Sequence, residues 1–337
     1  MRFFFVGYLF FFTLEAFCSH HLQLLGQWNN RARAQYNDIW GYEDSNGDEY
    51  ALLGVRNGTS VIDIRNPLLP KEISFIPSAN SIWKDIKTYQ HYAYVVNESG
   101  GGLQIIDLSK LPESASLVAT YKGFQTSHNL YIDTQAGILY AEGNHAQPIR
   151  VFDLQNPLKP QLIQFFGVEC HDLHVQDGIA VVSEGGHGTI GIYDVSNPYD
   201  IHLMNRFEIP NSGYVHNSWL SEDGLQLITT EETPGKTIKL WDFKKQGKSQ
   251  LIDEYLAPNG LAHNAFIKDG YAFISHYGSG LRILKLQHGF EEVAYFSPTE
   301  RNPRGYLGSW GVYPFFQSNK ILLSNIESGL YILEFKK

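Results

Sequence analysis

The sequence of 337 residues contains only two cysteines, two methionines and 18% charged residues, against about 25% charged residues in an average protein. So few cysteines exclude a scaffold held together by disulfide bonds. Acidic residues exceed basic ones by 35 to 26, and the net charge of −9 argues against a nucleic-acid partner, because phosphate binding needs a basic surface. No long segment has the apolar period of an amphipathic helix. Glycine (31 residues) and aromatic residues (14%) are abundant instead, which favours an all-β fold.

The N-terminus has the features of a secretory signal peptide. Arg2 precedes an uncharged, mostly aromatic run over residues 3–12, and Ala16 and Cys18 supply small residues at positions −3 and −1 of a cleavage site. The run is short for a transmembrane helix, and an uncleaved anchor is the alternative. We therefore predict a signal peptide over residues 1–18 and an extracellular protein, secreted or surface-associated, with no transmembrane span in the mature chain.

Cleavage at this site would leave Cys170 as the single cysteine of the mature chain. Two triplets, Asn57-Gly58-Thr59 and Asn97-Glu98-Ser99, fit the acceptor pattern for N-glycosylation. They matter only in a host that glycosylates its secreted proteins.

One phrase, apolar-x-apolar-Asp followed by a turn, recurs along the chain. Successive copies are separated by 44, 46, 41, 48, 43 and 49 residues. The last residue of the phrase is, in order, Asp63, Asp107, Asp153, Asp194, Asp242, Lys285 and Glu334. The last two copies are degenerate, and Asn-Pro follows three of the others. Internal repeats of this length are typical of β-propellers.

Each copy lies within the same order of predicted strands. Upstream there is a hairpin, marked by turns such as Asp177-Gly178, Asp223-Gly224 and Asp269-Gly270, and downstream there is a short apolar strand such as residues 161–166. Four strands in a unit of about 45 residues make one propeller blade. The spacing predicts seven blades, with six or eight as alternatives where the copies are degenerate.

The seventh unit ends with the chain, before its outermost strand. Residues 22–28 resemble the outermost strands of other units, and pairing them with the seventh unit would remove an open sheet edge. The prediction is an all-β, seven-bladed β-propeller of four-stranded blades, closed by an N-terminal strand. It forms a single domain over residues 20–337 and a monomer.

The phrases Val61-Ile62-Asp63-Ile64 and Ile105-Ile106-Asp107-Leu108, with Asn-Pro after several copies, resemble the LVIVD repeat. The complete layout, with a secretion signal first, resembles the choice-of-anchor B family. This resemblance covers nearly the whole mature chain and implies a secreted or surface-attached propeller. It implies no particular reaction.

Four adjacent units have a histidine at one position of the inner hairpin. The spacings between these histidines are 43, 45 and 47 residues. They are His128, His171, His216 and His263. The other three units have Asn37, Lys84 and Trp310 in this part of the hairpin instead.

Counting outward from each hairpin turn predicts the partners of these histidines. His171 falls opposite Glu184, His216 opposite Glu231 and His263 opposite His276, while Glu142 falls opposite His128 or Asn129. Directly opposed residues share one face of a sheet. Because inner strands line the axial channel of a propeller, these pairs are expected to converge at one mouth of it.

Convergent imidazoles predict a metal site. His128, His171, His216 and His263 are the predicted ligands, and Glu142, Glu184, Glu231 and His276 are predicted to orient them or bind a ligand. Such donors suit Fe, Zn, Cu or Mn better than Ca or Mg. The alternative is that the histidines are structural hydrogen-bonding groups copied by duplication, although a structural role alone would favour all seven units.

Other residues are weaker candidates. Cys170 is expected to pack in the core rather than act as a nucleophile, and His174 is also expected in the core. His145 and His187 are expected in solvated loops near the same mouth. The tryptophans of the three units without histidine either fill the channel or form an apolar wall for a ligand; they are Trp40, Trp83 and Trp310.

The sequence therefore predicts a secreted or cell-surface binding module whose partner is a small molecule or an extracellular protein. It carries a His/Glu metal or ligand site at one mouth of the channel. One alternative is a metal-dependent enzyme, an oxygenase or hydrolase, that uses the same site. The other is a protein-interaction scaffold. Which residues would be catalytic does not follow from the sequence.

Overall fold

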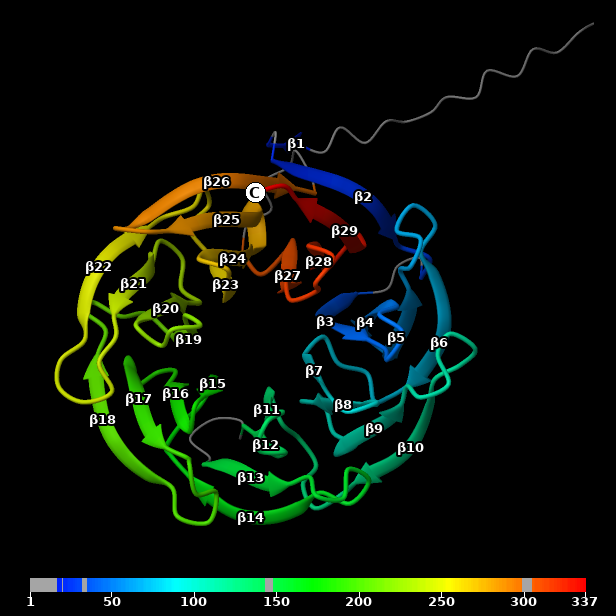
Figure 1. Ribbon diagram of the computed structural model, residues 1–337, viewed down its shortest axis with the longest axis horizontal. Coiled ribbons are helices and arrows are strands. Elements are labelled where there is room, and N and C mark those ends of the chain that lie inside the picture. Colours follow the sequence, from blue (N-terminus) through cyan, green and yellow to red (C-terminus); the bar gives the residue numbers. More distant parts are fainter. Residues whose placement is uncertain (1–16, 20, 32–34, 143–147, 299–304) are drawn as a thin grey trace, which may run out of the picture.

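Seven antiparallel sheets stand around a central axis in the computed structural model (Figure 1). The structure describes residues 17–19, 21–31, 35–142, 148–298 and 305–337. Consecutive sheets are neighbours in the ring, and each runs from an inner strand at the axis to an outer strand at the rim (Figure 1). The predicted seven-bladed β-propeller is confirmed.

The first three blades each follow the chain from the inner to the outer strand. Blade 1 consists of β3 (Tyr36–Glu43), β4 (Glu49–Val55), β5 (Gly58–Asp63) and β6 (Lys71–Pro77). Blade 2 consists of β7 (Lys84–Tyr89), β8 (Tyr92–Asn97), β9 (Leu103–Asp107) and β10 (Ser116–Tyr121). Blade 3 consists of β11 (Leu130–Asp133), β12 (Ile138–Ala141), β13 (Ile149–Asp153) and β14 (Gln161–Phe166).

Blades 4 and 5 repeat this order. Blade 4 consists of β15 (Asp172–Gln176), β16 (Ile179–Ser183), β17 (Thr189–Asp194) and β18 (His202–Glu208). Blade 5 consists of β19 (Val215–Leu220), β20 (Gln226–Glu231), β21 (Ile238–Asp242) and β22 (Gln250–Tyr255).

The last two blades include strands from the N-terminus. Blade 6 consists of β23 (Ala262–Lys268), β24 (Tyr271–His276), β25 (Gly280–Leu286) and β26 (Phe290–Ser297), with β1 (Phe17–Cys18) at its edge and the 3-10 helix η1 (Tyr277–Ser279) after β24. Blade 7 consists of β27 (Ser309–Tyr313), β28 (Lys320–Asn325), β29 (Gly329–Phe335) and β2 (Leu22–Trp28).

The repeated aspartate forms a turn after the third strand of a blade. Its side chain accepts a hydrogen bond from the backbone N–H two residues later, as in the pairs Asp63–Arg65 (3.0 Å) and Asp107–Ser109 (2.8 Å). The asparagine of Asn-Pro does the same, and Asn66 accepts from the N–H of Leu68 at 3.2 Å. Short polar side chains stabilise turns in this way, which explains why the phrase repeats.

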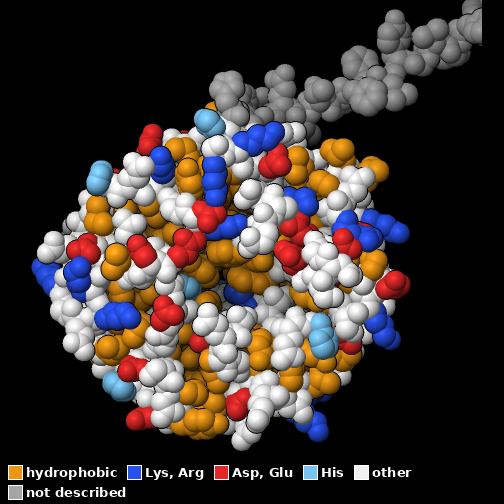
Figure 2. Space-filling model, in the orientation of Figure 1, with side chains coloured by type: hydrophobic (Ala, Val, Ile, Leu, Met, Phe, Trp, Pro, Cys, Tyr) orange, Lys and Arg blue, Asp and Glu red, His pale blue; other side chains and the backbone are white. Residues whose placement is uncertain are grey.

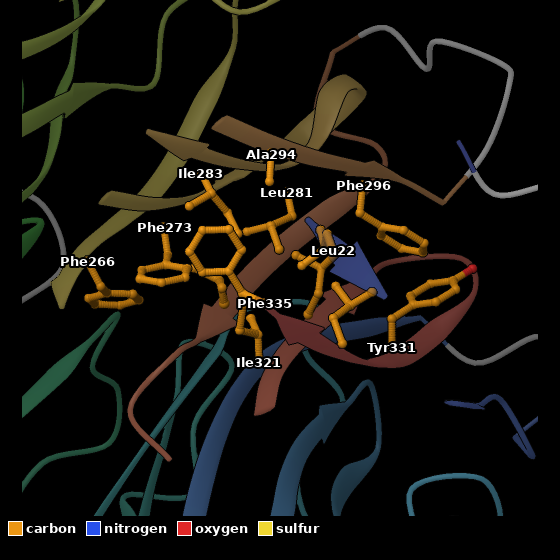
Figure 3. Close-up of a cluster of buried hydrophobic side chains, with 13 residues drawn as sticks. Leu22, Phe266, Phe273, Leu281, Ile283, Ala294, Phe296, Ile321, Tyr331 and Phe335 are labelled. Atoms are coloured by element: carbon orange, nitrogen blue, oxygen red, sulfur yellow. The ribbon is translucent and has the colours of Figure 1, made fainter. Parts of the chain in front are cut away.

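The N-terminal strand β2 closes the ring, as predicted, by pairing with β29 from Leu22↔Phe335 to Trp28↔Leu330. Leu22 packs among buried side chains between blades 6 and 7, including Leu281 and Phe296 (Figure 3). A Cβ atom at Gly26 would lie 1.8 Å from the carbonyl oxygen of Pro67 in blade 1, so glycine is required there.

The predicted signal peptide lies mostly outside the described residues, because residues 1–16 are not described. Its last two residues form β1, which pairs with Phe296 and Ser297 of β26. Cleavage after Cys18 would remove β1 and keep β2, the strand that closes the ring. In the described part of the chain, no helix has the length and hydropathy needed to cross a bilayer.

Candidate functional site

The four histidines of the inner strands lie together at one mouth of the axial channel. Their ring centroids follow one another at 4.2 Å (His128–His171), 3.8 Å (His171–His216) and 4.4 Å (His216–His263). His171, His216 and His263 are buried, whereas His128 is partly exposed. The convergence that the repeat spacing predicts is therefore present.

Two of the histidines lie in β-bulges. In β19 the pairs are Val215↔Glu231 and then Asn217↔Thr230, so His216 is an extra residue. In β23 the register likewise shifts between Ala262 and Ala265, around His263. A bulge re-aims the side chains it contains. Bulges also interrupt β3 and β27 at the same point of the inner strand. The bulge is therefore a feature of several blades and does not depend on a histidine.

The bulges correct two of the predicted pairs. Glu231 lies opposite Val215 and not opposite His216, and His276 lies opposite Ala262 and not opposite His263. Counting from the hairpin turn fails there because the inner strand has one residue more than a regular ladder. In blade 4 the ladder is regular. His171, just before Asp172, and Glu184, just after Ser183, are the next residues beyond the pair Asp172↔Ser183.

The predicted orienting carboxylates Glu184 and Glu231 bind cations of their own blades. Arg206 donates to both oxygens of Glu184 at 2.7 and 2.8 Å, and Thr189 and Tyr193 also donate to it. Glu231 forms a buried ion pair with Lys239. Neither glutamate forms a hydrogen bond to any of the four histidines among the described residues, and their role at the site stays a prediction.

The other two predicted residues of this group also lack a bond to the four histidines. Glu142 lies opposite Asn129, is fully buried, and has no hydrogen bond to either carboxylate oxygen among the described residues. Burial raises its pKa well above the ordinary value. His276 accepts a hydrogen bond at Nε2 from the N–H of Leu261 at 3.1 Å.

Backbone carbonyls of the next blade orient two of the imidazoles. His171 Nδ1 lies 3.1 Å from the carbonyl oxygen of His216, and His263 Nδ1 lies 2.6 Å from that of Trp310. In blade 3, His128 Nδ1 bonds to the carboxylate of Glu98. Each of these acceptors requires a proton on Nδ1 in the neutral ring, which leaves the lone pair on Nε2.

His216 differs from its neighbours because neither ring nitrogen makes a hydrogen bond of normal length and angle among the described residues, although the backbone of His263 interacts with the ring and the residue is only 1% exposed. An unsatisfied buried polar group costs about 1–3 kcal/mol. Burial and the neighbouring imidazoles hold the pKa of His171 and His216 well below its usual range, and burial lowers the pKa of His263 to about 3. All three rings are therefore neutral at pH 7, as metal coordination requires.

Glu232 is the carboxylate that approaches the histidines. Its Oε1 lies 3.9 Å from Nε2 of both His216 and His263, and it accepts a 2.5 Å hydrogen bond from the hydroxyl of Tyr277. Possible ligand atoms of His171, His216 and Glu232 all lie within 4.8 Å of one another. Burial raises the pKa of Glu232.

Glu98 and Glu232 were not among the residues predicted from the sequence, although the sequence contains a signal for both. Each directly follows the second strand of its blade, after Asn97 in β8 and after Glu231 in β20. Glu142 and Glu184 occupy the same position in blades 3 and 4. Aligning strand ends, rather than counting from turns, therefore identifies one glutamate in each of four consecutive blades.

A layer of Asp and Asn side chains follows the histidines along the channel and joins neighbouring blades. Asp38 accepts from the N–H of Ile86 at 3.0 Å, and Asn217 donates to Asp172 at 2.6 Å. The ammonium of Lys87 donates to Asp85 at 2.5 Å. Burial raises the pKa of Asp38 well above its ordinary range and that of Asp172 to about 6.

The pocket beneath the histidines is narrow. It is lined by His128, His171 and His263 together with Trp83 and Lys87, and the space open to the centres of water-sized molecules is about 20 Å³. That is enough for a water molecule or an ion. Viewed along the ring axis, hydrophobic side chains surround a depression near the centre of the face shown (Figure 2).

The predicted tryptophans have three different environments. Trp310 is buried beside His263, Trp83 is 42% exposed at the rim of the narrow pocket, and Trp40 lines a second pocket at the other end of the channel. Trp310 therefore fills space, whereas the other two present aromatic surface to the channel.

The weaker candidates are placed as follows. Cys170 and His174 are buried, His187 is exposed, and His145 lies outside the described residues. Asn57 is exposed in the turn between β4 and β5, whereas Asn97 is buried and its amide donates to the carbonyl of Ala79 at 2.7 Å.

Comparison with known proteins identifies the repeat. Residues 83–122, which make up blade 2, match the family model of the LVIVD repeat. The chain therefore carries an LVIVD repeat within a seven-bladed propeller, and the wider resemblance to the choice-of-anchor B family stays a prediction. No curated protein matches the sequence.

Solved structures of similar shape support the fold alone, because their sequence identities are low. A functionally unknown protein from Desulfotomaculum acetoxidans has 17% identity and a TM-score of 0.64, over 85% of this chain and 92% of that one. The WD40 β-propeller domain of Doa1 has 10% identity and a TM-score of 0.67, over 94% and 98%. The computationally designed protein Ika8 has 11% identity and a TM-score of 0.59, over 89% and 83%.

Proposed function

We propose that this protein is a secreted or cell-surface binding module that holds one transition-metal ion at the histidine mouth of its channel. The ligands are His171, His216 and Glu232, with His128 and His263 beside them. The observation that carries the proposal is His216, a buried and neutral imidazole that makes no hydrogen bond of normal geometry and whose Nε2 lies 3.9 Å from the carboxylate of Glu232.

The donor set favours particular metals. Imidazole nitrogens with one carboxylate suit Zn, Fe, Cu or Mn better than Ca or Mg, which prefer oxygen ligands. The carbonyl contact at Nδ1 of His171 leaves its Nε2 free to bind, and the Tyr277 hydroxyl orients Glu232. Because burial raises the pKa of Glu232, binding of a cation would favour the ionised carboxylate.

The narrow pocket favours a binding module over an enzyme. Of the three proposed ligands only His171 lines this pocket, and its space of about 20 Å³ leaves no room for an organic substrate next to that ligand. The carbonyl contacts at Nδ1 of His171 and His263 would also join neighbouring blades without a metal. Metal content and stability must therefore be measured separately.

Metal analysis of the purified full chain tests the proposal. After incubation with Zn²⁺ and removal of free metal, we expect about one equivalent in the wild type, because His171, His216 and Glu232 form a single cluster of possible ligands. The variant His171→Ala/His216→Ala should retain none. The matched control is His202→Ala, which removes an exposed histidine on β18 and should leave the metal content unchanged.

Two outcomes would contradict the proposal. Equal zinc content in all three proteins would place the metal elsewhere. A metal-free wild type with a double variant of lower melting temperature would show that the histidines only join blades.

A further inference from the structure

A second, wider pocket lies at the opposite end of the channel. It is lined mainly by aromatic side chains and has a volume of about 270 Å³. Its lining includes Trp40, Tyr131, Trp219, Tyr313, Phe315 and Lys87. It shares Lys87, Tyr131 and Trp219 with the narrow pocket, so these three side chains separate the two.

The position of the aromatic pocket follows from the repeat. Trp40, Tyr131 and Trp219 each lie three residues after the histidine position of their inner strand. A strand rises about 3.3 Å per residue, so the aromatic layer lies about 10 Å farther along the channel. The pocket is therefore distinct from the metal site, and the inference does not depend on a metal.

The rings form a connected wall that is only partly covered by protein. Phe315 lies 5.4 Å from Tyr313, 5.6 Å from Trp219 and 6.2 Å from Trp40, measured between ring centroids. All four side chains are partly exposed. Planar aromatic molecules stack on such surfaces or meet their edges, which adds to the free energy of apolar burial.

Lys87 provides the polar contact of this pocket. One N–H of its ammonium donates to Asp85, and the ammonium lies 4.5 Å above the ring of Trp40. Asp85 is its single hydrogen-bond acceptor in the described part of the chain. Two further donors can therefore serve a ligand oxygen.

The charges around Lys87 select a neutral ligand. Asp38, Asp85 and Asp172 surround this single cation and interact with it electrostatically. A carboxylate ligand would face the carboxylate of Asp85, and a cationic ligand would face the ammonium of Lys87. A neutral hydroxyl or carbonyl oxygen avoids both costs and satisfies the free donors.

We infer that this pocket binds a neutral, planar aromatic molecule of one or two rings whose hydroxyl or carbonyl oxygen accepts a hydrogen bond from Lys87. The size limit follows from the volume, which lies just below the range of about 300–1,000 Å³ typical of sites for drug-sized ligands.

Calorimetric titration of the full chain with 2-naphthol tests the inference. We expect saturable binding that is about tenfold tighter than binding of 2-naphthoate or of 2-naphthylmethylammonium, which have the same rings with a charge of either sign. Phe315→Ala should weaken 2-naphthol binding about tenfold through loss of a stacking surface. Phe315→Leu keeps apolar volume without a flat ring and should also weaken 2-naphthol binding. It replaces Phe315→Ala in the test if the alanine variant does not fold.

Trp83→Ala is the matched control, because it removes an exposed ring at the histidine mouth and should leave the affinity unchanged. Absence of saturable binding overturns the inference. Equal affinity for the three probes overturns the assignment to a neutral ligand. An unchanged affinity in both Phe315 variants, or a loss in Trp83→Ala, overturns the location.

Discussion

The histidine mouth has two arcs that use the same repeat position in different ways. Blades 3 to 6 place His128, His171, His216 and His263 there, and blades 1 and 2 place Asn37 and Lys84. Both arcs have buried polar side chains close to the axis. They differ in how many hydrogen bonds the backbone makes to those side chains.

In the arc without histidine, the protein provides the hydrogen-bond partners. The Lys84 ammonium donates to the carbonyl oxygens of Val55 and Arg56 at 2.9 Å each and to that of Ser81 at 3.1 Å. All three of its N–H groups therefore have acceptors. The amide of Asn37 also reaches Ser81, at 3.4 Å.

In the histidine arc, backbone carbonyls satisfy one nitrogen in two of the four rings. Carbonyls accept from Nδ1 of His171 and His263, and His216 makes no hydrogen bond of normal geometry among the described residues. One repeat position can therefore either join blades or present lone pairs to the channel. The decisive property is the number of backbone acceptors within reach, not the burial of the side chain.

The largest effect is expected for His216→Phe, which separates metal binding by this residue from a role in joining blades. Zn²⁺ at about 100 times its dissociation constant should stabilise the wild type by about 2.7 kcal/mol and the variant not at all. Without metal the variant should be as stable as the wild type or slightly more so, because it removes two buried polar atoms that lack a hydrogen bond of normal geometry. Thermal melts with and without Zn²⁺ measure both quantities. A large loss of stability without metal would mean that His216 joins blades as Lys84 does.

The next effect is expected for Lys84→Met, which keeps apolar bulk and removes the ammonium. The free energy of unfolding should fall by about 2 kcal/mol, because buried carbonyls lose their donors. Denaturant unfolding measures the loss, with the exposed Lys159→Met as control. Zinc content should not change. A loss of zinc in Lys84→Met would show that the two arcs form a single site.

The smallest effect is expected for Tyr277→Phe, which changes the histidine arc at one hydrogen bond. Loss of the hydroxyl that holds Glu232 should weaken zinc affinity about tenfold, the lower end of the range for residues that orient metal ligands. Competition with a chelator measures the affinity. Tyr306→Phe alters the neighbouring exposed ring and should leave it unchanged. Equal affinities in both variants would remove Glu232 from the site.

Most of the fold could be predicted because its signals are local and repeated. The phrase ending in Asp63 and its copies marks the third strand, and its turn chemistry depends on residues two positions apart. The closing strand followed from the missing last element of the pattern, the outer strand of blade 7. Neither inference needs knowledge of side-chain geometry.

The site could be predicted only in part, because bulges change the register. The spacing of the histidines was sufficient to bring His128 and its three counterparts together. Counting through the hairpin placed Glu231 opposite His216, whereas the extra residue at His216 puts Glu231 opposite Val215. The partners of Glu184 and Glu231 were also missed, because Arg206 and Lys239 come from strands outside the hairpin.

The pairing of β2 with β29 has a consequence for biosynthesis. On the ribosome β2 emerges before any blade exists, and its partner emerges after almost all of the ring has been translated. The ring therefore closes by a contact of very large sequence separation, which costs loop entropy and slows folding. Until that moment blade 7 keeps an unpaired strand edge.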